Sequence, residues 1–188
     1  MFILISGKRC SGKDYCGDLL EKYLKEMVSE SSTKNIKVAT KSFALRLKEH
    51  FASDNGCSLE RLLNDRPYKE IYRKQLIEYS KEYEDVKWVR TVYNESEEDI
   101  VIITDFRYNI EYEYINIREN LRTVKIVCKD ETRISRGWVY DESIDELEGE
   151  TELNSFDLWD YVIRNDTKPN RDIQIIARDI FRDFIEEL

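Results

Sequence analysis

The residues best suited to chemistry lie near the N-terminus, in Gly7–Asp14 (GKRCSGKD). Gly7, Gly12 and Lys13 have the spacing of G-x-x-x-x-G-K-[ST], in which successive backbone N–H groups turn inward around a phosphate and the lysine reaches its oxygens. Asp14 stands where Ser or Thr is usual, and a carboxylate there can hold magnesium directly or through water. Its added charge can be balanced by the preceding Lys8 and Arg9. The pattern predicts a site for the phosphates of a nucleotide.

The surroundings of this loop decide between a phosphate site and an ordinary turn. The apolar run Ile3–Ile5 precedes it, and apolar pairs from Leu19 to Val28 follow it at the four-residue step of an amphipathic helix. A strand, a glycine loop and a helix in this order provide the expected context, and the helix adds its positive N-terminal end. Without that context, the glycines would indicate only a turn. We therefore favour the functional interpretation.

A second carboxylate with a plausible role is Asp105, which closes the β-branched run 99–105 (DIVIITD). Such a continuous run is typical of a central parallel strand. A carboxylate at its end occupies the place where phosphoryl-transfer folds order magnesium. The alternative is that Asp105 caps the next helix. With the phosphate loop present, we favour a metal-binding role for Asp14 and Asp105.

The remaining elements predict an α/β fold. Further strands are expected at 36–43, 123–128 and 161–163, and helical stripes run through Ile110, Tyr114, Ile117 and Leu121 and from Ile173 to Leu188. Strands that alternate with helices predict a three-layer P-loop kinase fold, a five-stranded parallel sheet with helices on both faces.

Between the second and third expected strands lies a charged, mostly helical segment, from residue 44 to about 95. Asn64 and Asp65 are cap candidates for a helix whose first turn contains Pro67. Cations three and four residues apart share a face of that helix, and two more follow it: Arg66, Lys69, Arg73, Arg90 and Arg107. They suit an acceptor that is itself anionic, although local salt bridges, for example to Glu70 and Glu78, are the alternative.

Composition excludes several other classes of protein. The chain has 188 residues, enough for one domain, and a net charge of −9, which argues against a broad basic face for nucleic acid. Residues 141–160 hold nine acids and no Lys or Arg, which we interpret as a solvated surface. The four cysteines form no C-x-x-C pair, and no apolar stretch suits a signal peptide or a membrane span. We expect a cytoplasmic monomer that takes small-molecule substrates and binds neither nucleic acid nor membranes.

Longer motifs resemble one enzyme family. GKRCSGKDY, RLKEHFASDNG followed four residues later by RLL, YKEIYRK, TDFR, RISRGWVYD and LNSFDLWDYVIRN look like segments of the animal-type phosphomevalonate kinases, in the family's order from Ile3 to about Asn165. The family resembles nucleoside monophosphate kinases in fold. The resemblance implies ATP-dependent phosphorylation of (R)-5-phosphomevalonate to 5-diphosphomevalonate in the mevalonate pathway of isoprenoid synthesis, with Mg²⁺.

The resemblance also implies roles for individual residues. Lys13, Asp105 and Arg107 are expected to be catalytic. ATP is expected to contact Gly7, Lys8, Arg9, Ser11, Gly12, Lys13, Asp14, Tyr15, Arg133, Arg136 and Asn165. The acceptor is expected to contact Lys48, Lys69, Arg73, Arg90, Arg107 and Lys125. The core is expected at about 1–43 and 99–188, an acceptor-binding insert at about 44–98, and a lid over ATP at about 129–142.

The chain departs from the family at two cations. Tyr108 replaces a second arginine after Arg107, and Cys10 replaces a basic residue. Lys125 stands where the family tends to have arginine, which keeps the charge but loses a bidentate fork. Two alternatives therefore stay open: a phage-type deoxynucleoside monophosphate kinase, whose loop is similar, and a non-catalytic nucleotide-binding module. The only histidine, His50, is interpreted as structural, because a phosphate acceptor is already ionised and needs no strong general base.

Overall fold

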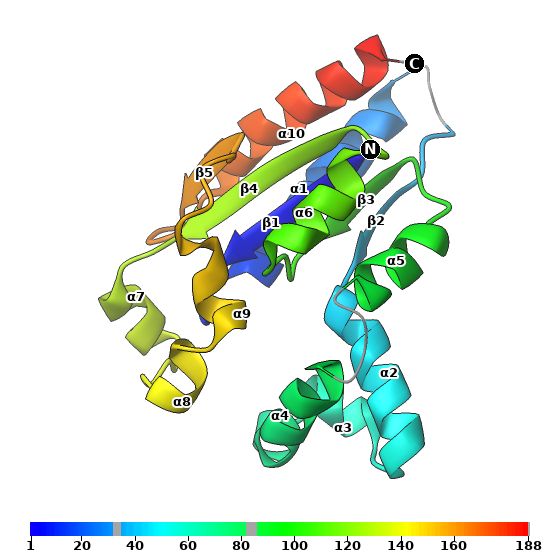
Figure 1. The fold of residues 1–188 in the computed structure, drawn as a ribbon. Helices are drawn as coiled ribbons and strands as arrows, with labels where there is room; N and C mark the ends of the chain where they lie inside the picture. The colour runs from blue at the N-terminus through cyan, green and yellow to red at the C-terminus, as the bar shows by residue number, and fades with distance from the viewer. Residues whose placement is uncertain (32–34, 82–85, 188) are drawn as a thin grey trace. The chain divides into compact units, whose positions relative to one another are not determined.

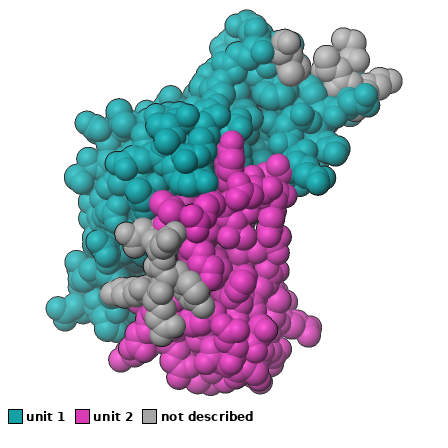
Figure 2. All heavy atoms as spheres, turned by 45° about the vertical axis from the view of Figure 1, so that its right-hand side comes forward, with its two compact units in different colours: residues 1–41, 97–188 teal, residues 42–96 magenta. Residues whose placement is uncertain are grey.

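The computed structural model describes residues 1–31, 35–81 and 86–187. The chain divides into two compact units, which Figure 2 colours separately: Met1–Lys41 with Glu97–Leu188, and Ser42–Ser96. We call them the core unit and the helical unit. Leu188, the last residue of the predicted C-terminal stripe, lies outside the described residues.

The core unit is built on one sheet. Its strands are β1 (Phe2–Gly7), β2 (Val38–Lys41), β3 (Ile100–Ile103), β4 (Leu121–Val127) and β5 (Tyr161–Arg164). They lie in the order β2-β3-β1-β4-β5, and every neighbouring pair is parallel. The predicted five-stranded parallel sheet is thus confirmed. All strands point the same way, so their carboxyl ends share the edge where the phosphate loop begins.

Helices cover both faces of this sheet (Figure 1). The long helices α1 (Lys13–Glu30) and α10 (Asn170–Glu186) pack in one cluster with Ile3, Ile5 and Ile102. Because side chains alternate along a strand, Phe2 and Leu4 face the other way. That second face is the side on which α6 (Asn109–Asn116) crosses the sheet (Figure 1). The N-terminal strand is therefore buried on both faces, which fixes where the phosphate loop leaves the sheet.

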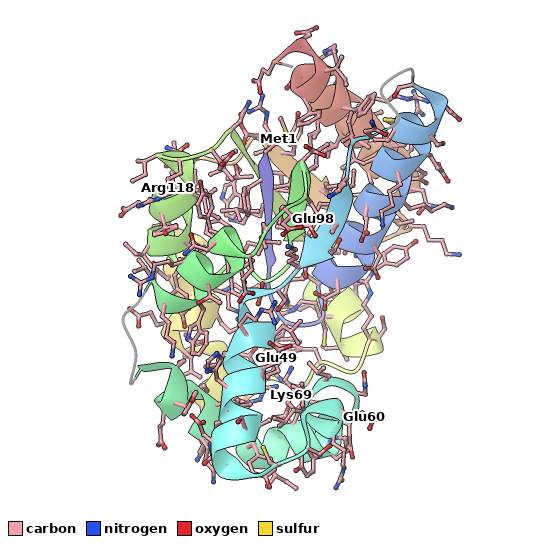
Figure 3. The ribbon with its side chains drawn as sticks, turned by 90° about the vertical axis from the view of Figure 1, so that its right-hand side faces the viewer. Met1, Glu49, Glu60, Lys69, Glu98 and Arg118 are labelled. Carbon is pink, nitrogen blue, oxygen red and sulfur yellow. The ribbon has the colours of Figure 1, made fainter. Side chains whose placement is uncertain are left out.

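Hydrogen bonds and an ion pair secure the starts and ends of the central strands. The N-terminal ammonium of Met1 donates to the main-chain oxygen of Asp99 at 2.8 Å. Lys41, at the end of β2, pairs with Glu98 at 2.5 Å, and Figure 3 labels Glu98 beside that strand. These contacts hold β2 and β3 in register with β1.

Several predicted boundaries are off by one or more residues, and two residues fall in the wrong type of element. Phe43 was expected in the second strand but begins a helix, because the hydroxyl of Ser42 accepts a hydrogen bond from Leu45 N at 3.2 Å and caps the helix N-terminus. Leu121 was expected on the helical stripe from Ile110, yet it starts β4, where it pairs with Phe2. Leu121 matched the helical spacing by coincidence, and its conformation is set by pairing with β1.

The helical unit contains α2 (Phe43–Asn55), α3 (Leu59–Asn64), α4 (Arg66–Lys81) and α5 (Lys87–Asn94). Asp65 caps α4 as predicted, since its carboxylate accepts from Tyr68 N at 3.1 Å. Phe51 packs edge-on against Tyr79, with ring centroids 5.4 Å apart. The unit therefore has an aromatic core of its own.

Short helices join β4 to β5. They are α7 (Asp130–Ser135), α8 (Glu142–Asp145), α9 (Glu148–Thr151) and the 3₁₀ turn η1 (Glu152–Asn154). Across the described ranges, no helix combines the length and the apolar character that a membrane span needs.

Candidate phosphate-binding and catalytic site

The phosphate loop depends on two glycines, for different reasons. Gly12 is the N-cap of α1 and has a φ of +84°, a conformation that favours glycine. An added Cβ there would also collide with the side-chain amide of Asn165. At Gly7, a Cβ would lie 2.5 Å from Ser11 Oγ and 2.8 Å from the main-chain oxygen of Ile126. The loop is therefore folded tightly against both the end of β4 and the start of α1.

The loop borders a cavity of about 340 Å³ at the carboxyl ends of β1 and β4. Four cations contribute to its lining: Lys8, Arg107, Lys125 and Arg133. Ser11 also lines it, and its hydroxyl is buried without a hydrogen-bond partner in the described part of the chain. A buried hydroxyl without a partner costs free energy that a ligand oxygen can recover. The cavity suits an anion rich in oxygen atoms.

The loop lysine lies close to a second cation. Burial and then the charge of Arg107 lower the pKa of Lys13, while Asp14, Glu150 and Asp105 act in the opposite direction. Two cations this close repel each other unless an anion lies between them. Lys13 and Arg107 are thus close enough to repel each other, and an anion between them would relieve that repulsion.

The predicted metal residues are the two carboxylates that act on Lys13. Asp14 is exposed at the start of α1, and Asp105 follows β3. In the described ranges, no three His, Cys, Asp or Glu residues cluster as a protein-only metal site would require. Mg²⁺ in kinases is held by one or two carboxylates together with substrate phosphates. The donors present therefore fit a magnesium ion shared with a nucleotide.

Two arginines predicted in the lid hold the main chain of the loop. Arg133 Nε donates to the oxygen of Arg9 at 2.9 Å, and its guanidinium lies over the ring of Trp138. Arg136 donates to the oxygen of Ser11 at 2.9 Å and to that of Asn165 at 2.7 Å. Both cations therefore reach the nucleotide loop, through its carbonyl groups.

Asn165 completes this ring of donors. Its side-chain amide donates to the oxygen of Ser11 at 2.8 Å, and the residue is almost wholly buried. Tyr15 lies on the exposed side of α1, where its hydroxyl contacts Asn170. The structure thus brings Asn165 to the loop and leaves Tyr15 outside the cavity lining.

The acidic stretch is not simply the solvated surface that we predicted. Asp145 is buried, pairs with Arg9 at 3.0 Å and accepts from the indole N–H of Trp138 at 3.1 Å. Glu150 pairs with Arg107, and its main-chain oxygen accepts from Lys8. The correction has an electrostatic reason: the loop concentrates cations, and this stretch supplies their counter-charge. The sequence signal for this role was the stretch itself, which has nine acids and no Lys or Arg within an otherwise neutral chain.

Arg107 is held at several points. Its guanidinium donates to the oxygen of Gly149 at 2.7 Å as well as to Glu150. Burial lowers the pKa of Arg107, but the ion pair with Glu150 outweighs this, and the net direction is upward. Arg107 therefore stays charged at every pH where the protein is folded.

A buried carboxylate that we had not predicted fixes the main chain of Arg107. Glu111 accepts hydrogen bonds from the backbone N–H groups of Arg107 at 2.7 Å and Tyr108 at 3.0 Å. Burial raises the pKa of Glu111 to about 8, despite those two hydrogen bonds. Glu111 stands three residues after Tyr108, which is the spacing of an N-terminal capping box and could have been recognised.

The other predicted acceptor residues belong to the helical unit. Lys48 lies on α2, Lys69 and Arg73 on α4, and Arg90 on α5. Figure 3 labels Lys69. The side chain of Arg66 lies outside the described residues. Arg73 was expected either to bind the acceptor or to form a local salt bridge. The salt bridge is present, since two of its nitrogens donate to Glu70 at 2.6 Å.

The only histidine also lies in the helical unit and has a packing contact. The ring of His50 meets Trp88 edge-on, with centroids 5.3 Å apart. The aromatic contact agrees with the structural role expected for His50.

Solved structures share the fold. Shikimate kinase from Aquifex aeolicus superposes with a TM-score of 0.51 over 98% of this chain and 99% of that one, at 19% identity. A Thermus thermophilus protein superposes with a TM-score of 0.52 over 97% of each chain, at 14% identity. These likenesses confirm the P-loop kinase architecture.

Sequence comparisons identify the family. A curated phosphomevalonate kinase from Drosophila melanogaster is 27% identical over 179 residues, which cover 87% of each chain. The family model described as phosphomevalonate kinase matches residues 5–142, a range that contains the phosphate loop, Arg107 and both lid arginines. The chain therefore belongs to the phosphomevalonate kinase family.

Proposed function

We propose that the chain transfers the γ-phosphoryl group of ATP to (R)-5-phosphomevalonate and releases ADP and 5-diphosphomevalonate. One observation carries the proposal: a phosphate loop opens onto a cavity lined by four cations and by Ser11, whose buried hydroxyl has no hydrogen-bond partner within the part of the chain that the structure describes. Family membership supplies the identity of the acceptor. The product belongs to the mevalonate pathway of isoprenoid synthesis.

The donor side uses the loop and the segments that hold it. Backbone N–H groups of 7–14 and the side chain of Lys13 bind the β- and γ-phosphates of ATP. The segment 129–142 acts as a lid, from which Arg133 and Arg136 reach the nucleotide. Mg²⁺, held by Asp14 and Asp105, would neutralise charge on those phosphates.

The acceptor side is assigned separately for each unit. Arg107 and Lys125 line the cavity of the core unit. Segment 44–98 serves as the acceptor-binding insert and contributes Lys48, Lys69, Arg73 and Arg90. An acceptor that carries a phosphate and a carboxylate needs this many cations, because it must approach the equally anionic ATP.

The transfer itself requires positioning more than proton removal. An oxygen of the acceptor phosphate attacks the γ-phosphorus in line, and ADP leaves as the P–O bond breaks. Lys13 stabilises the donor oxygens, and Arg107 stabilises charge on the group in transit. Neither requires a general base, in agreement with a histidine that packs on Trp88.

A second candidate is a deoxynucleoside monophosphate kinase, and a third is a nucleotide-binding module without activity. The cationic cavity favours a small, highly charged acceptor over a nucleobase, which would need a pocket rich in aromatic surface.

An ADP-release assay with Mg-ATP separates the three. We expect turnover with 5-phosphomevalonate and none with dTMP or dGMP. Turnover only with a deoxynucleotide would select the second candidate. ATP binding without turnover on any acceptor would select the third.

The site takes small-molecule substrates, and we expect it to act in a cytoplasmic monomer. The four cysteines, of which Cys10 borders the loop and Cys16 is buried in α1, are all free thiols. Free thiols support a reducing compartment.

A further inference from the structure

The cations of the cavity are already engaged by one acidic segment. We call residues 142–154 the strap; it comprises α8, α9 and η1 and holds six acids with no Lys or Arg. Within the strap, Glu150 has the deepest carboxylate at the cavity, with its side chain 7% exposed. The strap, the loop and Arg107 all belong to the core unit.

Glu150 holds two of the lining cations at once. Its carboxylate pairs with Arg107 Nη1, and the same nitrogen donates to the oxygen of Gly149 at 2.7 Å. The main-chain oxygen of Glu150 accepts from Lys8 Nζ. The strap therefore presents three oxygen atoms to two cations, in the manner of a phosphoryl group.

The same donors are needed by a substrate. A guanidinium recognises a carboxylate and a phosphoryl group through the same fork of N–H groups. Arg107 Nη1 donates to both Glu150 and Gly149, so its two N–H groups are engaged and a phosphoryl oxygen can reach this nitrogen only by replacing one of these acceptors. Ser11 differs, since it lines the cavity and its buried hydroxyl has no hydrogen-bond partner among the described residues. A ligand that takes Arg107 Nη1 must therefore displace the Glu150 carboxylate from it.

We propose that Glu150 is a specificity-determining residue whose carboxylate occupies the place of a substrate phosphoryl group on Arg107 and sets the charge a ligand must carry. A weakly charged ligand cannot replace the carboxylate, because its electrostatic attraction to Arg107 is too weak to offset the loss of the ion pair with Glu150. A polyphosphate can, because Lys8 and Arg107, which both line the cavity, gain charged oxygens together. The entry of phosphate thereby frees Arg107 Nη1 for the transferred group. This inference rests on the proposed function, since it assigns Arg107 to the transferred group.

A contrary role for Glu150 would give the opposite result. If the carboxylate instead held Arg107 in its working orientation while the ligand is bound, removing its charge would weaken binding. The variant Glu150→Gln keeps the side-chain size and removes the charge. Glu142→Gln removes the same charge from an exposed position of the strap and serves as the matched control.

The test is titration of each protein with pyrophosphate by isothermal calorimetry. We expect Glu150→Gln to bind pyrophosphate roughly 5- to 20-fold more tightly than the wild type, in the range of a competing charge pair. Glu142→Gln should stay within about twofold of the wild type, as expected for an exposed charge. Equal or weaker binding by Glu150→Gln would overturn the proposal.

Hydrogen exchange provides a second readout on the wild type alone. The amides of Leu147 and Glu150 are hydrogen-bonded within the strap, at 3.3 Å and 2.8 Å. Saturating pyrophosphate should increase their exchange by roughly threefold or more, as the strap opens locally. Unchanged or slower exchange would contradict displacement. Pyrophosphate has no acceptor specificity, so these results stand whether or not 5-phosphomevalonate is the acceptor.

Discussion

The side-chain amide of Asn165 lies 2.8 Å from the main-chain oxygen of Ser11, although 154 residues separate them in sequence. This hydrogen bond ties the residue after β5 to the turn of the phosphate loop. The same oxygen accepts from Arg136 at 2.9 Å. The conformation of the loop is thus held by donors that lie far from it in the sequence.

We expect Asn165→Ala to loosen this arrangement. One buried hydrogen bond of this kind contributes about 1 kcal/mol to the free energy of unfolding. The affinity for ATP should fall roughly fivefold, because the main-chain oxygen of Ser11 loses a hydrogen bond that holds the loop in place. Urea unfolding and ATP titration measure the two effects. Asn116→Ala, at the exposed end of α6, is the control and should change neither. Normal ATP affinity in Asn165→Ala would remove Asn165 from the nucleotide site.

Gly12 and Gly56, two of the three described glycines with positive φ, form a matched pair. Alanine at either position costs about 1 kcal/mol for the left-handed backbone. At Gly56, an added Cβ meets open space, whereas at Gly12 it collides with the Asn165 amide. We expect Gly12→Ala to abolish measurable ATP binding and to lower the melting temperature more than Gly56→Ala, which should bind ATP normally. Equal effects of the two substitutions would refute the role of the collision.

Arg107→Ala should reduce turnover by roughly 10²-fold or more, because a cation placed on the transferred group acts mainly in the transition state. The measurement is kcat with saturating ATP and acceptor. Arg118→Ala, after the end of α6 (Figure 3), removes an exposed arginine as the control. Near-normal kcat in Arg107→Ala would exclude Arg107 from the mechanism.

Glu111 should make stability depend on pH. Its pKa rises from 4.5 in the unfolded chain to about 8 when folded, so the folded state binds the proton more tightly. The contribution of Glu111 is therefore most favourable below pH 4.5, declines as pH rises, and is fully lost above about pH 8. Glu111→Gln does not titrate.

The difference in unfolding free energy between the wild type and Glu111→Gln should therefore shift against the wild type between pH 5.5 and 7.5. The expected slope is on the order of 1 kcal/mol per pH unit. Urea unfolding at three pH values measures it. Parallel curves for the two proteins would show that Glu111 does not titrate in this window.

Local patterns were enough to predict most of the fold and the loop. The run at 99–105 and the step from Leu19 to Val28 depend on neighbours in the sequence, and both elements form. Leu121 shows where such patterns fail, because its partner Phe2 is far away in the sequence and decides its conformation. Phe43 failed for a local reason, the cap supplied by Ser42.

The site was less predictable than the fold. Lys8 and Arg9 were recognised as cations, but their partners, Glu150 and Asp145, come from a stretch interpreted as solvated surface. The charge of a segment does not show whether its acidic side chains face solvent or pair with the cations of a nearby loop. Glu111 was missed because its capping-box spacing after Tyr108 was overlooked, and its burial shows only in the folded structure.

The most direct test of the central claim is ³¹P NMR of the complete reaction, with the protein, Mg-ATP and (R)-5-phosphomevalonate. The account predicts that ADP and a diphosphate monoester appear in equal amounts while the phosphomonoester signal disappears. Formation of ADP with inorganic phosphate alone, and an unchanged phosphomonoester, would contradict it.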